Sequence, residues 1–208
     1  MDIPATSVFL NHVLFFVNIG LIGFVMTAIC VRFVFPSISF EGEYFWIIRS
    51  APISMNQFYF QKALFYVVPI GLLGAGLTMV SNGVLSVDFS LWLWSTLLVG
   101  SLSFVLTAGA LVAGTYFPKF NYDHFSEVVT SAGSMIYMIA GMFYVAGVVG
   151  VLLIPVYSNL SGQNVPPGDI LNSFPPMVMV MSTVSIILGL FFLVAGARKV
   201  EDYGFGRL

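Results

Sequence analysis

Five long stretches of this sequence contain no Asp, Glu, Lys or Arg. They are residues 3–31, 63–87, 89–118, 128–168 and 170–197, each at least 25 residues long. About 20 apolar residues are enough to cross the hydrocarbon of a bilayer as an α-helix. Charged residues make up only 8% of the chain, which is too few to cover a water-facing surface. The sequence therefore predicts an integral membrane protein.

The apolar runs are continuous, which favours helices over the alternating ten-residue segments of a membrane barrel. We expect an all-α fold, a polytopic helical bundle that forms a single transmembrane domain over residues 1–208. Pro36 should end or kink the first span, and Ala110 and Gly114 have the spacing that lets two helices approach closely. The predicted spans are residues 9–34, 63–82, 90–115, 130–156 and 174–197.

The basic residues predict the orientation. Five spans leave the two termini on opposite sides of the membrane, and Lys and Arg concentrate on the cytoplasmic side. We therefore place the N-terminus outside and the C-terminus in the cytoplasm of a cell whose cytoplasmic (inner) membrane holds the chain. All seven basic residues then share the cytoplasmic side, namely Arg32, Arg49, Lys62, Lys119, Arg198, Lys199 and Arg207. Only acidic residues, Asp2, Asp88 and Asp169, fall on the other side.

Several functional classes are disfavoured by what the sequence lacks. No charged residue lies in the middle of a predicted span, as an ion-coupled transporter usually requires. No G-x-x-x-x-G-K-[ST], G-x-S-x-G or H-E-x-x-H motif is present, so we expect no nucleotide-binding site and no catalytic residue in this chain. The single cysteine excludes internal disulfides and a cysteine metal cluster, and we expect no metal or other cofactor. A net charge of −2 argues against a nucleic-acid partner.

The cytoplasmic segment 37–61, between the first two spans, carries the most local information. Ser39 can cap a new helix with one apolar face, and Pro52 should stop that helix. Ser54 and Gln57 then have the spacing of a capping box that starts the helix of the second span. The segment is thus predicted to form an amphipathic helix at the membrane interface. The pattern alone favours an interfacial elbow that anchors the bundle over a specific functional role.

Three short motifs resemble one family. The sequence reads EGEYFW at 41–46, RSAPIS at 49–54 and YFPKF at 116–120, the last followed by a span rich in small residues. This order resembles permease subunits of the ABC type-2 exporter class, most closely the C-terminal half of long ABC exporter permeases. The family's usual transmembrane domain has six spans, whereas five are predicted here. We therefore expect the chain to be a C-terminal half, a truncated open reading frame or a split subunit.

The resemblance implies partners and contact residues. In that family the segment after an early span is a coupling helix that docks on a separate ATP-binding subunit, which supplies ATP and Mg²⁺. Matched by position, the docking residues are Glu41, Gly42, Glu43, Arg49 and Pro52. The 118–127 loop would make a second, shorter contact through Asp123, His124 and Glu127, unless it is only a solvated connector.

These inferences lead to an expected function and one alternative. The chain is expected to be a membrane-spanning permease component of an ATP-driven exporter, paired with a second permease half or copy within the lipid bilayer. Its spans are apolar and uncharged, which suits an amphipathic, lipid-like or drug-like substrate. The alternative is a non-transporting membrane subunit that scaffolds or assembles a larger complex. The presence or absence of an ATP-binding partner distinguishes the two.

Overall fold

The fold is all-helical wherever the structure describes it. The computed structural model describes residues 5–44, 50, 52–85, 89–119, 124–160 and 167–205, and these ranges contain no strand. Five helices are long and apolar enough to cross a membrane, which confirms the predicted class and number of spans. The long helices are α1 Ala5–Ile29, α3 Met55–Val84, α4 Phe89–Tyr116, α6 Ala132–Leu160 and α7 Pro167–Phe205, and a short helix, α5, spans Phe125–Val129.

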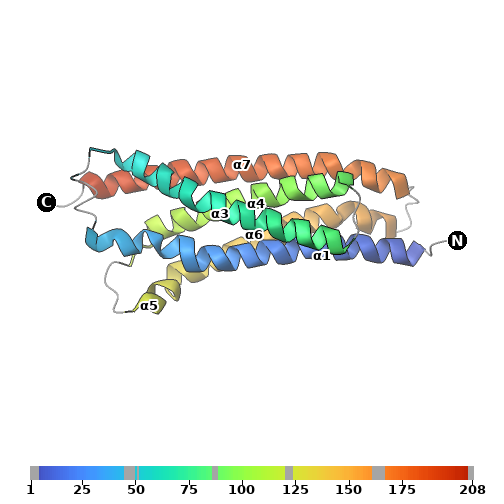
Figure 1. The fold of residues 1–208 in the computed structure, drawn as a ribbon, viewed down its shortest axis with the longest axis horizontal. Helices are drawn as coiled ribbons and strands as arrows, with labels where there is room; N and C mark the ends of the chain where they lie inside the picture. Colours follow the sequence, from blue (N-terminus) through green and yellow to red (C-terminus); the bar gives the residue numbers. More distant parts are fainter. Residues whose placement is uncertain are drawn as a thin grey trace.

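The five long helices run side by side, and successive helices run in opposite directions (Figure 1). α1 therefore begins at one end of the bundle and α7 finishes at the other. The start of α3, the ends of α4 and α7 and the whole of α5 share this second end, which we call the basic end. The described basic residues near it are Arg32, Lys62, Lys119, Arg198 and Lys199. The predicted grouping of the two loops with the end of α7 is thus confirmed, while the side of the membrane that they face stays a prediction.

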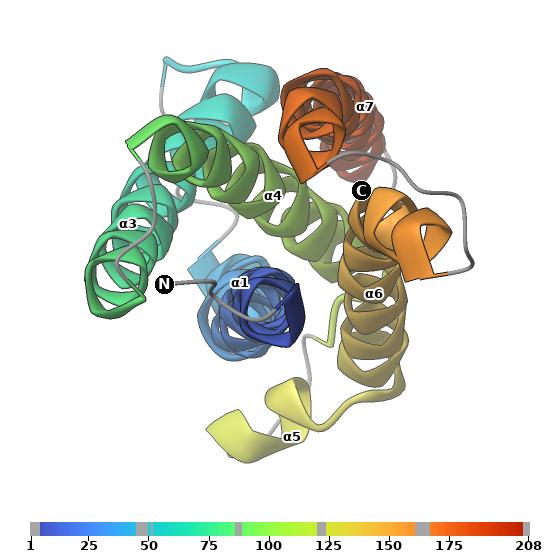
Figure 2. The ribbon, with the colours of Figure 1, turned by 90° about the vertical axis from the view of Figure 1, so that its right-hand side faces the viewer.

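α4 is the central helix of the bundle. It packs against α1, α3, α6 and α7, and Figure 2 shows it lying between them. In its most apolar stretch 67% of the residues are buried, against 22% for α3 and 28% for α7. Its buried hydroxyl groups donate hydrogen bonds to carbonyls of their own helix, which satisfies them without water. They belong to Ser95, Ser101, Ser103, Thr107 and Thr115.

The outer faces of the bundle are strongly apolar. In water such a surface would be unfavourable, but it suits contact with lipid tails. Large side chains exposed on α3, α6 and α7 include Phe65, Leu72, Val80, Ile136, Phe143, Ile187 and Phe191. The apolar outer surface of the bundle is thus suited to contact with the acyl chains of a bilayer.

The first span does not end at the proline. α1 gives way to the π-helix η1 (Cys30–Val34), and a 3-10 helix, η2 (Phe35–Ser37), follows with Pro36 in its first turn. The backbone N–H of Phe35 donates to the carbonyl of Cys30, five residues back. A proline is tolerated in a first turn because its missing N–H is not needed there. Pro36 therefore accompanies a change of winding, and the helical path continues.

The segment after η2 differs from the predicted amphipathic α-helix. Residues Ser39–Tyr44 form a further 3-10 helix, η3, while 45–49 lie outside the described residues. The Ser39 hydroxyl does not cap its own helix. It is buried, and it accepts a hydrogen bond from the backbone N–H of Lys119 at 3.2 Å. A contact with another part of the fold thus replaces the expected cap.

The predicted capping box is confirmed. The Ser54 hydroxyl accepts from the N–H of Gln57 at 3.2 Å, and the Gln57 side chain accepts from the N–H of Ser54 at 3.2 Å. These reciprocal bonds satisfy two of the backbone donors that a helix start leaves free. They fix where α3 begins.

Small residues bring α4 directly onto the backbone of the first span. Ala110 and Gly114 are both buried, and a Cβ added to Gly114 would overlap the carbonyl oxygen of Phe35. The start of α6 packs equally closely against the residue that follows α4, since a Cβ on Gly133 would lie 2.5 Å from the Cβ of Phe117. At Cys30 the side chain is fully buried, with its sulfur 3.9 Å from the Thr107 hydroxyl.

Replacing Gly114 with alanine should destabilise the bundle by about 1–3 kcal/mol, because the methyl group would push two backbones apart. The measurement is the midpoint of thermal unfolding in detergent. The matched control is Gly100→Ala on the same helix, where a Cβ meets open space and alanine should be neutral or stabilise by up to about 1 kcal/mol. Equal midpoints for the two variants would contradict this account of the contact.

Candidate functional site at the basic end of the bundle

The first set of predicted docking residues lies around η3. Glu41 and Gly42 are within this helix and partly exposed. Glu43 belongs to the same helix, but its side chain is outside the described residues, as is the whole of Arg49. Pro52 is exposed, in the break before α3. The structure therefore describes the exposure of three of these five residues, Glu41, Gly42 and Pro52.

Glu41 is held inward, by a contact that the sequence did not reveal. Its carboxylate forms an ion pair with Lys62 of α3, with 2.7 Å between Oε2 and Nζ. The same ammonium donates to the carbonyl of Ser37 at 2.6 Å and lies 5.5 Å from the centre of the Phe58 ring. Only 8% of the Lys62 side chain is exposed, against 32% of Glu41. Glu41 thus fastens η3 onto α3.

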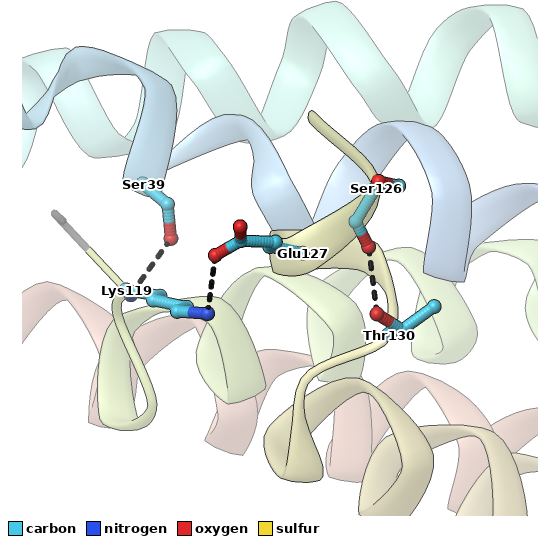
Figure 3. Close-up of polar contacts among 5 residues, drawn as sticks. All are labelled: Ser39, Lys119, Ser126, Glu127 and Thr130. Atoms are coloured by element: carbon cyan, nitrogen blue, oxygen red, sulfur yellow. Dashed lines mark hydrogen bonds and ion pairs between the residues drawn. The ribbon is translucent and has the colours of Figure 1, made fainter. Parts of the chain in front are cut away.

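The second predicted contact surrounds α5. Asp123 lies outside the described residues. His124 is exposed and stands just before the helix, where its carbonyl accepts from the N–H of Glu127 at 3.0 Å. Lys119 donates to the Glu127 carboxylate at 2.9 Å, and both side chains are about two-fifths exposed (Figure 3). That hydrogen bond and the positive charge of Lys119 lower the pKa of Glu127, and His124 adds a smaller effect of the same sign.

The two predicted contact segments are joined to each other. Besides the hydrogen bond from Lys119 to the Ser39 hydroxyl (Figure 3), the rings of Phe40 and Phe125 stack with centroids 5.2 Å apart and planes at 26°. A contact between aromatic rings of this kind contributes about 0.5–1.5 kcal/mol beyond the area it buries. η3, α5 and the end of α4 therefore form one structural unit, which we call the coupling platform.

The end of α7 packs against the start of α3, which the sequence analysis did not anticipate. The Asn56 amide donates to the Glu201 carboxylate, 145 residues along the chain. Tyr59 is fully buried against Gly196, where a Cβ would overlap its hydroxyl group. The length of the last helix is the feature that could have indicated this contact. At 39 residues α7 is about 58 Å long, well beyond a hydrocarbon core of about 30 Å.

The described part of the site combines paired charges with exposed aromatic rings. Among the described residues, no three His, Cys, Asp or Glu side chains are grouped so that they could hold a metal ion. Its charges are compensated in pairs, and half-exposed aromatic rings lie beside them, as with Phe125 at 53%.

Together, the fold and this surface define a multi-pass helical membrane protein with a folded polar platform at one end. The sequence profile of a family described as "Putative ATP-binding cassette" matches residues 1–205, and the chain belongs to this family. Searches of curated proteins and of solved structures return no match.

Lys62→Met should lower the free energy of unfolding by roughly 1–3 kcal/mol, because it leaves the partly buried Glu41 carboxylate without its cation and the Ser37 carbonyl without a donor. Chemical unfolding in detergent would measure it. Arg198→Met, at an exposed position of the same end, is the control and should change stability by less than about 0.5 kcal/mol. If the two variants unfold alike, the ion pair does not hold η3 in place.

The pKa of Glu127 should lie below 4.5, the ordinary value for this group. Because the folded pKa is depressed, its contact with Lys119 is present above pH 4.5 and is lost as the pH falls through the folded pKa. Lys119→Met should return the pKa to about 4.5. A titration of the ¹³C-labelled glutamate carboxyls, with Glu127→Gln to assign the signal, measures both values. An identical midpoint with and without Lys119 would refute the assignment.

Proposed function

We propose that the chain is the membrane-spanning permease component of an ATP-driven exporter, in which a separate subunit binds and hydrolyses ATP. Membership of a family named for the ATP-binding cassette supports an ABC context. The sequence contains no G-x-x-x-x-G-K-[ST] motif, so the phosphate-binding loop would belong to the partner. The five candidate spans supply the membrane part of such an assembly.

The observation that carries this proposal is the union of the two segments expected to dock. Ser39 of the first segment bonds to Lys119 of the second, and Phe40 stacks on Phe125. A partner that pressed on either segment would displace both together. Since η3 is also paired to α3 through Lys62, that displacement would reach the first, second and third spans.

The transport step would follow from this connection. Closure of the ATP-binding partner would move the coupling platform, and the spans attached to it would open a path in an alternating or lateral manner. A second permease half or copy would complete that path. The uncharged, lipid-facing spans suit an amphipathic, lipid-like or drug-like substrate that enters from the bilayer.

The alternative is a non-transporting membrane subunit that assembles a larger complex. The same joined segments could then hold a neighbouring protein in place, and the uncharged spans would need no pathway. What separates the two functions is the identity of the docked protein.

The test is a pull-down of the tagged chain from its native membrane in mild detergent, with every co-purifying protein identified. We expect a stoichiometric soluble subunit that carries G-x-x-x-x-G-K-[ST]. Glu43→Lys should reduce its recovery at least tenfold, because a reversed charge at a docking surface costs more than about 1.4 kcal/mol. The control is Asp169→Lys, which makes the same reversal in the first turn of α7 at the opposite end.

One result would count against the exporter, and another against the docking surface alone. If only other membrane proteins co-purify, the scaffold function takes its place. If the ATP-binding subunit is recovered equally with Glu43→Lys and with the wild-type chain, the docking surface is not where we place it, even though the exporter assembly stands.

A further inference from the structure

One charged side chain interrupts the lipid-facing surface of the first span. Val17, Leu21, Val25 and Ala28 are exposed and follow one another at helical spacing, and Arg32 continues this stripe. Figure 2 shows α3, α4 and α6 around α1 on three sides and α5 on the fourth, near the basic end. The stripe therefore faces lipid, and it ends in a guanidinium group.

Arg32 has no counter-charge within the described part of the chain. The carboxylates described at the basic end are engaged with Lys62, Lys119 and Asn56. Among the described residues, none forms a hydrogen bond or an ion pair with Arg32. Anionic lipid headgroups attract a basic side chain at a membrane surface.

The depth of Arg32 indicates which anion is within reach. Phe35, three residues further on, packs against Gly114 near the end of α4 and against Gly133 in the first turn of α6. Arg32 thus lies about one helical turn inside those helix ends, where a long side chain reaches the headgroup layer. The π-helix also exposes its neighbour Phe33, at 61%, which can contact the acyl chains below the headgroup.

We propose that Arg32 binds the phosphate of an anionic phospholipid in the leaflet at the basic end, with Phe33 against its acyl chains. A guanidinium can donate two parallel hydrogen bonds to a phosphate group. The bound lipid would lie against the exposed face of the first span at the basic end. The proposed lipid site does not rest on the proposed exporter function.

The test is native mass spectrometry of the purified chain in mild detergent, titrated with phosphatidylglycerol or with phosphatidylcholine of the same acyl chains. Wild-type protein should retain phosphatidylglycerol more tightly. Arg32→Gln should weaken this binding about fivefold, the effect of one basic residue at an anionic membrane surface, and leave phosphatidylcholine binding unchanged. Arg198→Gln, an exposed arginine of the same end on α7, is the matched control and should change the affinity less than twofold.

Three results would overturn the proposal. One is unchanged phosphatidylglycerol binding in Arg32→Gln, and another is an equal loss in Arg198→Gln, which would indicate only diffuse attraction. The third is displacement of the lipid by inorganic phosphate at millimolar concentration, which would indicate a general anion site. If Arg32→Gln does not fold, Arg32→Met, which also removes the charge, takes its place, and wild-type affinity in that variant would exclude the site.

Discussion

A bilayer offers the backbone no hydrogen-bond partner, and the whole bundle follows from that constraint. Each span must satisfy its own N–H and C=O groups, so it is helical, and association between spans then depends on close packing and on few polar contacts. α4 meets this requirement with small residues, and at Gly114 it rests on the carbonyl of Phe35. That contact coincides with the change from π to 3-10 winding in the first span. The contact between α4 and the first span, within the membrane, therefore helps to set where the coupling platform lies.

The sequence predicted those features that depend on local order along the chain. Charge-free runs defined five spans, and the spacing of Ser54 and Gln57 defined the start of α3. Contacts between distant segments could not be predicted in this way. Ser39 and Lys119 are 80 residues apart, and Asn56 and Glu201 are 145 apart, so no pattern of short period contains either pair.

The same limit explains how Glu41 was interpreted. A charged residue in a cytoplasmic loop reads as solvent-facing or partner-facing, since the sequence does not show that Lys62, at the start of the next span, would be folded beneath it. Burial of the ammonium makes the ion pair structural. The sequence predicted that the two segments expected to dock lie at one end of the molecule, whereas their direct bond to each other required the tertiary structure.

Cys30 gives the chain a practical property. It is the only cysteine in the sequence, and no part of it reaches the surface, because it is enclosed where the π-helix meets α4. A bulky water-soluble thiol reagent therefore has no native target on the folded protein. Any cysteine introduced at a chosen surface position would be the sole reactive group, so spin labels and fluorophores can report movements of individual helices without first removing a natural residue.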